Sequence, residues 1–279
     1  MNRVLAILPL RSGSKRIKDK NIRVVGYYPL FYHIIKTCLL VPEIEKIIVS
    51  TDSLEYKRLV ESYFGNEARV KVSIRPQNIS SDNTKTEDVI QQILNKKKYF
   101  NNYKYVALVQ ATTPLTRPED IKTAISEIVN NDYNSVFSVA KSDRFYLNDM
   151  SQLLVRPMTQ NKLPELYETG CFWLINIKAF IETNNRIIKP YSYVTVDEKF
   201  ALDIDDQNDM ILADKILSEK VRSLERKYFQ SRDMNKTNIN EYFDEHKDPD
   251  GNIRNISVSY THLRAHETVL DLVCRLLLE

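Results

Sequence analysis

Short apolar runs alternate with longer amphipathic stretches along most of the chain. The runs are bounded by turn residues and are typical of buried strands; they lie at residues 4–8, 46–50, 70–74, 105–110 and 135–139. The stretches between them have apolar residues at helical spacing, which predicts helices at residues 29–41, 54–64 and 86–94 and another that begins at Glu119. This alternation predicts an α/β fold with a doubly wound, mostly parallel sheet.

Composition and charge limit the classes of protein to consider. A chain of 279 residues with 43% hydrophobic content can form one large domain or two small ones. The net charge of +3 is too small to indicate nucleic acid as the main partner. Cys38, Cys171 and Cys274 are far apart and have no metal-binding spacing, which suits a reducing cytoplasm. No signal peptide and no run of about 18 apolar residues is visible, so we expect no membrane association.

A basic loop follows the first predicted strand and is the first candidate for chemistry. It contains Gly13, two serines and five cations, which are Arg11, Lys15, Arg16, Lys18 and Lys20. Backbone N–H groups near a glycine, together with lysine and arginine side chains, suit a polyphosphate. The alternative is a solvated basic loop. The loop contains neither a Walker A sequence nor G-x-G-x-x-G.

The order of residues in this loop is more informative than its composition. The sequence R-S-G-S-K-R-I-x-x-K-N, residues 11–21, resembles the signature of the acylneuraminate cytidylyltransferases, the CMP-sialic acid synthetase family. The resemblance implies that the loop wraps the triphosphate of CTP. The nucleotide ligands that it implies are Arg11, Ser14, Lys15, Lys20 and Asn21.

Two further blocks are similar to the same family. Residues 75–86 (RPQNISSDNTKT) imply that Arg75 and Thr86 bind CTP. An arginine offers forked donors to a base or phosphate, whereas Thr86 has the alternative role of capping the helix 86–94. Residues 110–117 (QATTPLTR) resemble the rim of the active site and imply that Gln110 contacts the pyrimidine. Asp52 ends the second predicted strand, where ligands gather, but capping of the helix 54–64 is the favoured role.

An acidic pair supplies the candidate metal site. Asp203 and Asp205 alternate around Ile204, so in an extended segment both carboxylates project to one side. Such a pair suits Mg²⁺ when water and phosphate oxygens complete its shell. The alternative is an acidic start to the predicted helix 206–224, with Asp206 or Asp209 near its first turn. The resemblance to the family's D-[IV]-D site favours Mg²⁺ on Asp203 and Asp205.

The predicted domain organisation has three parts. Residues 1–228 form the cytidylyltransferase domain, and the resemblance implies that residues 141–170 include a small arm that serves homodimerisation and encloses the sugar. Residues 229–256 are a linker or the start of a truncated second module, and residues 257–279 resemble a translated adaptor-like sequence and are expected to be a non-native tail. Thr169 replaces the family's usual asparagine, and residues 160–161 replace its Arg-Gln, so the identity of the sugar stays open.

The resemblance implies a reaction as well as a fold. CMP passes from CTP to the anomeric hydroxyl of a nonulosonic acid, a nine-carbon 2-keto acid sugar, for surface glycan synthesis. The resemblance assigns catalysis to Arg11, Lys15, Lys20 and Asp205, with Mg²⁺ as cofactor. The alternatives are a 3-deoxy-manno-octulosonate cytidylyltransferase, a D-x-D glycosyltransferase that binds a nucleotide sugar, and a non-catalytic nucleotide-sensing protein.

Overall fold

The computed structural model describes residues 3–76, 79–81, 84–142, 158 and 165–231. Contacts divide the chain into two units, residues 1–215 and residues 216–279. The sheet and the candidate site both belong to the first unit. Most of the predicted arm, the linker and the tail lie outside the described residues, so the assignments of these three segments stay predictions. None of the helices described is both long and apolar enough to cross a membrane.

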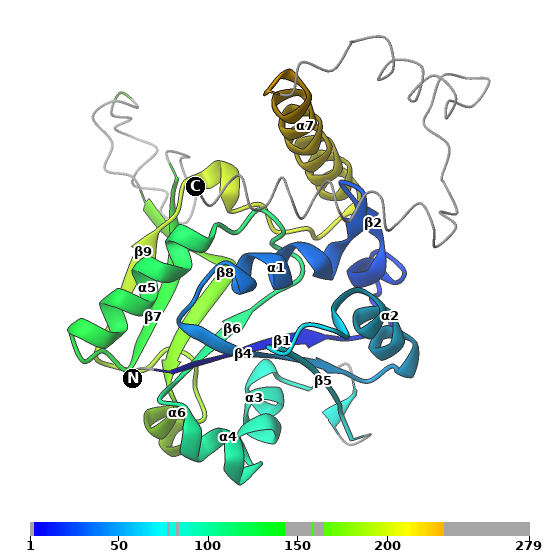
Figure 1. The fold of residues 1–279 in the computed structure, drawn as a ribbon. Helices are drawn as coiled ribbons and strands as arrows, with labels where there is room; N and C mark the ends of the chain where they lie inside the picture. Colours follow the sequence, from blue (N-terminus) through cyan, green and yellow to red (C-terminus); the bar gives the residue numbers. More distant parts are fainter. Residues whose placement is uncertain (1–2, 77–78, 82–83, 143–157, 159–164, 232–279) are drawn as a thin grey trace. The chain divides into compact units, whose positions relative to one another are not determined.

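A seven-stranded sheet forms the centre of the first unit (Figure 1). Its spatial order is β5-β4-β1-β6-β8-β7-β9. The strands are β1 (Val4–Leu10), β4 (Ile44–Thr51), β5 (Val70–Ile74), β6 (Tyr105–Val109), β7 (Ser135–Ser142), β8 (Glu165–Asn176) and β9 (Tyr191–Thr195). Neighbours are parallel except β8, which is antiparallel to both β6 and β7. The prediction of a mostly parallel α/β sheet is confirmed.

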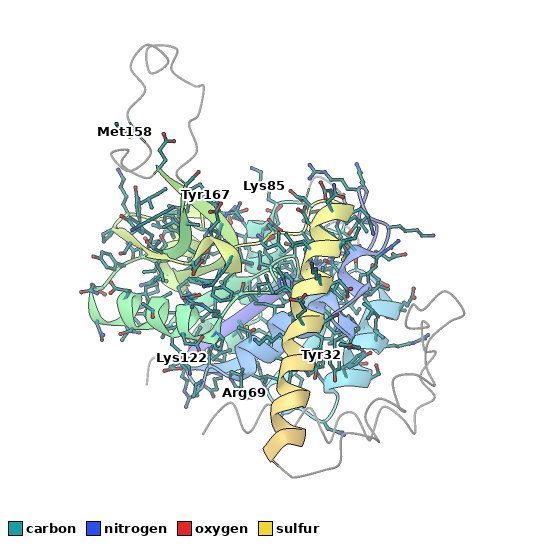
Figure 2. All side chains as sticks on the ribbon, turned by 90° about the horizontal axis from the view of Figure 1, so that it is seen from above. Tyr32, Arg69, Lys85, Lys122, Met158 and Tyr167 are labelled. Atoms are coloured by element: carbon teal, nitrogen blue, oxygen red, sulfur yellow. The ribbon has the colours of Figure 1, made fainter. Side chains whose placement is uncertain are left out.

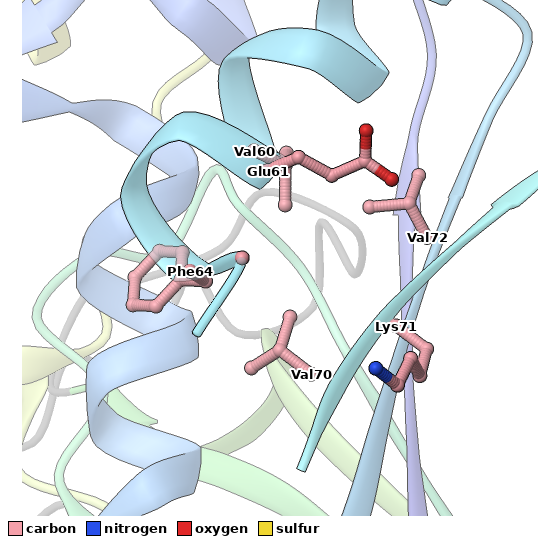
Figure 3. A pocket seen from close by; sticks show the side chains of 7 residues that line it. Val60, Glu61, Phe64, Val70, Lys71 and Val72 are labelled. Atoms are coloured by element: carbon pink, nitrogen blue, oxygen red, sulfur yellow. The ribbon is translucent and has the colours of Figure 1, made fainter. Parts of the chain in front are cut away.

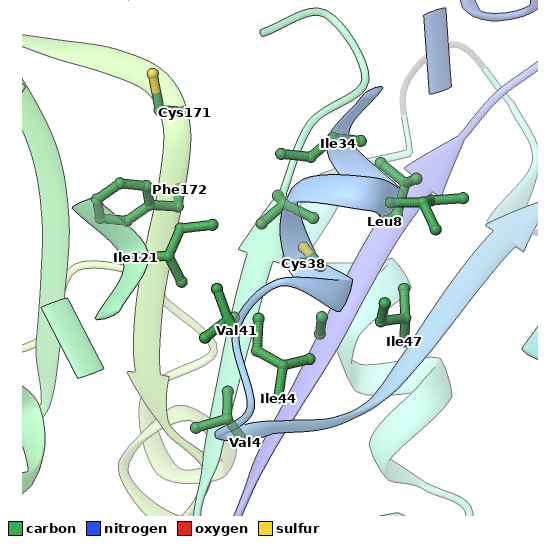
Figure 4. Packing of buried hydrophobic residues seen from close by; sticks show 14 of the residues in the cluster. Val4, Leu8, Ile34, Cys38, Val41, Ile44, Ile47, Ile121, Cys171 and Phe172 are labelled. Carbon is green, nitrogen blue, oxygen red and sulfur yellow. The ribbon is translucent and has the colours of Figure 1, made fainter. Parts of the chain in front are cut away.

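Helices cover both faces of this sheet, as a doubly wound fold requires. The side chains of β1 alternate, so Val4, Ala6 and Leu8 face one core and Leu5 and Ile7 the other. The first core packs against α1 (Leu30–Leu39), α2 (Leu54–Phe64) and α5 (Pro118–Asn130), and part of it is drawn in Figure 4. The second core packs against α3 (Thr86–Leu94), α4 (Lys97–Asn102) and α6 (Ile177–Thr183).

Short elements complete the described chain. A two-stranded hairpin, β2 (Val24–Val25) and β3 (Tyr28–Pro29), precedes α1. The 3-10 turns η1 (Lys20–Ile22) and η5 (Glu198–Phe200) precede the hairpin and the acidic pair. The long helix α7 (Gln207–Ser231) begins in the first unit and extends into the second.

The structure corrects two local predictions. β1 does not stop before Pro9 but continues to Leu10. Its ladder to β6 ends at Ile7, so beyond that residue β1 has a strand neighbour on one side only and tolerates a proline. Asp52 does not cap α2, because the hydroxyl of Ser53 accepts the bond from the Tyr56 N–H at 3.3 Å.

Arg69, which is labelled in Figure 2, immediately precedes β5 and lies near the amino ends of the strands. Its guanidinium donates to the carbonyls of Leu39 at 2.9 Å and Val41 at 2.8 Å, and to those of Cys38 and Ile44. These carbonyls belong to the end of α1 and to the turn that leads into β4. One rigid fork of donors therefore satisfies the exposed end of a helix and fixes the next strand against it.

A small cavity of about 70 Å³ lies between α2 and β5 (Figure 3). Its lining includes Val60, Phe64 and Val70, from the last turns of α2 and the first residue of β5. It therefore lies near the amino ends of the strands. Ligands of open α/β sheets bind at the opposite edge, so this cavity is not a candidate for the functional site.

We expect Arg69→Ala to lower the free energy of unfolding by about 2 kcal/mol or more, because several helix-end carbonyls lose a charged donor. Arg58→Ala is the matched control: Arg58 is an exposed arginine on α2, and its loss should change stability by less than about 0.5 kcal/mol. Urea denaturation followed by circular dichroism measures both. Equal stability of the two variants would show that the Arg69 contacts are not stabilising.

Candidate functional site

The carboxyl ends of the parallel strands bring the predicted site residues to one edge of the sheet. The chain proceeds from β1 outward to β4 and β5, and then returns to form β6 on the other side of β1. Such a reversal creates the crevice in which open α/β sheets bind ligands. Arg11, Asp52, Arg75 and Gln110 directly follow β1, β4, β5 and β6.

Hydrogen bonds fix the basic loop (residues 11–21) close to this edge. Ser12 donates from its backbone N–H to Asp52 Oδ1 at 2.8 Å and from its hydroxyl to Oδ2 at 3.1 Å. Gly13 has φ +72° and open space around its α-carbon. Asn21 is buried, and its Nδ2 donates to the Arg11 carbonyl at 2.9 Å. Asn21 thus closes the loop on itself, and its role as a nucleotide ligand stays a prediction.

Two cations of the basic loop contact the acidic segment. The Lys20 ammonium donates to the Ile204 carbonyl and lies 3.9 Å from Asp205 Oδ1. Arg16 Nη1 lies 3.1 Å from the same oxygen, in a pair exposed to solvent. Lys20 and Ile204 are 184 residues apart in sequence, yet the loop and the D-I-D segment meet at this point. Sequence reasoning placed Lys20 at the site but assigned no role to Arg16.

The backbone around Ile204 holds the acidic pair in place. Ile204 is fully buried, and its N–H donates to the Thr112 carbonyl at 2.8 Å. Asp203 and Asp205 on either side of it are exposed. This alternation agrees with the extended segment that the sequence predicted.

The start of α7 uses a different pair of aspartates. Asp206 Oδ1 accepts from the N–H groups of Asn208 at 2.7 Å and Asp209 at 3.0 Å. Asp209 Oδ2 accepts in return from the N–H groups of Asp205 and Asp206, each at 2.9 Å. This is a reciprocal capping arrangement. The capping alternative therefore describes Asp206 and Asp209, whereas the carboxylates of Asp203 and Asp205 are not used as caps.

Asp203 lies against the carboxyl end of β6 and the middle of β8. A Cβ atom added at Gly170 would lie 3.0 Å from Asp203 Oδ2 and 3.3 Å from Thr113 Cγ2, so a larger residue there would have to displace the Asp203 side chain slightly. Partial desolvation raises the pKa of Asp203, and the nearby Asp205 charge raises it further, while a hydrogen bond from Thr112 opposes both. Two neighbouring carboxylates that repel each other suit a divalent cation.

The types of side chain at the site determine which metal ion it can hold. Among the described residues, no group of three or more His, Cys, Asp or Glu side chains gathers. A carboxylate pair alone suits Mg²⁺, which keeps several waters and takes further oxygens from a substrate phosphate. Asp203 and Asp205 therefore fit the predicted cofactor.

Arg75 follows β5 and Gln110 follows β6, and these two strands are separated by β4 and β1 in the sheet. Arg75 is 6% exposed and donates from Nε to the Ser50 hydroxyl at 3.0 Å and from Nη2 to the Ser50 carbonyl at 2.7 Å. Burial lowers its pKa, and the Asp52 charge opposes that effect. The Thr112 hydroxyl donates to Gln110 Oε1 at 3.4 Å, which links Gln110 to the residue that supports the acidic pair.

The structure describes two threonines that the sequence analysis named. Thr86 is the first residue of α3 and Lys85 is its cap, so the capping alternative for Thr86 is wrong. Thr169 is buried at 4% exposure and donates to the Ser138 hydroxyl at 2.7 Å. Its effect on the choice of sugar stays a prediction. The substitutions at residues 160–161 lie outside the described residues.

Comparison with known proteins settles the family. The sequence matches the family described as Cytidylyltransferase over residues 5–244. The chain belongs to the cytidylyltransferase family. The N-acylneuraminate cytidylyltransferase of Escherichia coli O18:K1:H7 is 28% identical over 231 residues, which are 79% of this chain and 53% of that protein. The chain thus spans about half the length of the first relatives that it matches.

Shorter relatives in the family are covered almost completely. The CMP-N,N'-diacetyllegionaminic acid synthase of Legionella pneumophila is 29% identical over 77% of this chain and 96% of its own length. The pseudaminic acid cytidylyltransferase of Campylobacter jejuni is 28% identical over 76% and 95%. In structure, a CMP:2-keto-3-deoxy-manno-octonic acid synthetase complexed with CTP superposes with TM-score 0.60 at 12% identity, over 78% of this chain and 99% of that one. This likeness confirms the fold.

We expect Asp206→Ala to lower the melting temperature, because an N-cap contributes about 1 kcal/mol to stability. Asp205→Ala removes an exposed ion pair with Arg16 and a longer one, at 3.9 Å, with Lys20, and should change stability by less. Thermal denaturation of the two variants beside the wild type tests the assignment. An equal loss of stability in Asp205→Ala would mean that Asp205 serves the helix start after all.

Proposed function

We propose that the chain transfers CMP from CTP to the anomeric 2-hydroxyl of a nonulosonic acid, giving a CMP-sugar and pyrophosphate for surface glycan synthesis. One observation carries the proposal: the basic loop and the D-I-D segment meet at the carboxyl edge through Lys20, Arg16 and Asp205. A triphosphate and its cation need these two kinds of group side by side. Relatives named for acylneuraminic, pseudaminic and legionaminic acids support the substrate class.

Different residues at the carboxyl edge have different roles in the proposed reaction. The 2-hydroxyl oxygen loses its proton to water and forms a bond to the α-phosphorus, while the bond from phosphorus to the bridging oxygen breaks and its electron pair leaves with pyrophosphate. Arg11, Lys15 and Lys20 bind the triphosphate and stabilise the charge that grows on the leaving pyrophosphate. Ser14 and Asn21 support the same loop, and Arg75, Thr86 and Gln110 bind the nucleotide. Mg²⁺ held by Asp203 and Asp205 would supply further neutralisation of phosphate charge.

The oligomeric state and the cellular compartment also belong to this proposal. A homodimer is expected from the family resemblance, because residues 141–170 correspond to the family's dimerisation arm. A reducing cytoplasm suits a chain whose described cysteines, Cys38 and Cys171, are both free and buried. Size-exclusion chromatography with light scattering would measure the oligomeric state.

The second candidate is a 3-deoxy-manno-octulosonate cytidylyltransferase. One structural neighbour is named for a related acid sugar, 2-keto-3-deoxy-manno-octonic acid. The likeness at 12% identity concerns the fold alone, whereas the matching sequences are named for nonulosonic acids. The two candidates share CTP and differ in the acid sugar.

We expect the purified protein to release pyrophosphate only when CTP, Mg²⁺ and a nonulosonic acid are all present. A coupled pyrophosphate assay with each nucleoside triphosphate and a panel of acid sugars measures this directly. Turnover of 3-deoxy-manno-octulosonate alone would establish the second candidate. Equal turnover of UTP or ATP would contradict the proposed cytosine contacts of Arg75 and Gln110.

We expect Asp205→Asn to lower kcat by roughly 10² or more, with a smaller change in CTP affinity, because neutralisation matters most as charge develops on the phosphates. The matched control is Asp206→Asn, the same change at the next residue. Asparagine caps a helix about as well as aspartate, so kcat should persist. Steady-state kinetics at limiting and saturating Mg²⁺ compares them. Full kcat in Asp205→Asn would remove the metal role of this carboxylate.

A further inference from the structure

A row of alternating charges crosses the carboxyl edge of the sheet. The adjacent strands β1, β4 and β5 are followed by Arg11, Asp52 and Arg75, so one carboxylate lies between two guanidinium groups in the strand order. The electrostatic coupling agrees with this order: the Arg11 charge lowers the pKa of the buried Arg75, and the Asp52 charge raises it. An anion at this place needs an explanation, because it repels a triphosphate.

The contacts of Asp52 show what this anion does. Both of its oxygens accept from Ser12, the second residue of the basic loop, which is 40 residues away in sequence. Neither oxygen caps α2, since Ser53 performs that function. The carboxylate is thus turned toward the loop backbone.

A second contact holds the other end of the basic loop, at Asp19. Tyr56 lies in the first turn of α2 and is 1% exposed. Its hydroxyl donates to Asp19 Oδ1 at 3.2 Å. Asp19 has φ +54°, a left-handed conformation that non-glycine residues rarely adopt, and it immediately precedes η1, which begins with Lys20. Tyr56 therefore holds the loop at a turn that sets the direction of Lys20.

We propose that Asp52 and Tyr56 are positioning residues that clamp the basic loop at Ser12 and Asp19 and so preorganise it for the triphosphate of CTP. The inference rests on the proposed function, and neither residue touches the nucleotide. Both positioning residues lie in one short segment, which runs from the end of β4 into the first turn of α2. They bracket Gly13, Ser14 and Lys15, the part of the loop that the phosphates meet. Binding to a loop already ordered avoids the entropic cost of ordering it.

The test measures the binding of CTP and Mg²⁺ by isothermal titration calorimetry, without an acid sugar. Tyr56→Phe removes only a hydroxyl from a buried ring, and Asp52→Asn keeps one acceptor for Ser12 while removing the charge. We expect each variant to bind CTP roughly three- to tenfold more weakly, because the loop must be ordered on binding. The double variant should lose more than either alone. In turnover assays KM for CTP should rise more than kcat falls.

Ser53→Ala is the control for a merely structural effect. It removes the α2 cap, which lies between Asp52 and Tyr56 in sequence, and should lower the melting temperature. We expect CTP binding to stay at the wild-type value. If Asp52→Asn and Tyr56→Phe melt earlier but bind CTP as the wild type does, the clamp is refuted. If the wild type itself binds no CTP, the proposed function fails instead, so the two failures are distinguishable. Ser12→Ala, which loses one of the two bonds to Asp52, gives an independent reading and should weaken binding less than Asp52→Asn.

Discussion

The backbone of Ile204 joins the two halves of the candidate site. Its N–H donates to the Thr112 carbonyl beyond β6, and its carbonyl accepts from Lys20 of the basic loop. Because the side chain between these groups is fully buried, the segment cannot slip by one residue without burying a carboxylate, which is costly. A single buried isoleucine thus fixes where both aspartates lie and where one end of the basic loop is attached.

Balance of charge is the second constraint on this edge. The site gathers Arg11, Lys20 and Arg75, whose mutual repulsion would open it in the absence of counterions. Asp52 offsets the charge of Arg75, and Asp205 lies beside Lys20. The acidic residues therefore contribute to assembly of the site before any ligand is present, as well as to the chemistry proposed for it.

The sequence predicted the regular parts of the fold because they depend on local patterns. The bounds of α2, α3 and β5 agree with the apolar spacing and flanking turn residues. Tertiary contacts decided the rest. Ser53 and Asp52 are both good caps, and only the arrival of Ser12 beside Asp52 determines which of them serves α2. Thr169 lies within an irregularity in the pairing of β7 with β8, between Glu168 and Trp173, so simple alternation could not assign its face.

The same distinction applies to the site. A recognisable order of residues located the basic loop and the D-I-D pair, and the structure brings Arg16, Lys20 and Asp205 together. Specific roles for Gly170 and Thr112 could not be predicted from the sequence, because they come from the approach of Asp203. Tyr56 looked like an ordinary core residue of an amphipathic helix, and only its hydroxyl contact with Asp19 distinguishes it.

The antiparallel strand β8 has a consequence for how such a chain can diversify. Ser142, at the end of β7, is paired directly with Glu165, at the start of β8. The two ends of the intervening chain are therefore held side by side, on the edge where the candidate site lies. Chain segments that close between paired strand ends tolerate changes in length at small entropic cost. The number of residues between Ser142 and Glu165 can therefore change during evolution without shifting the register of the sheet.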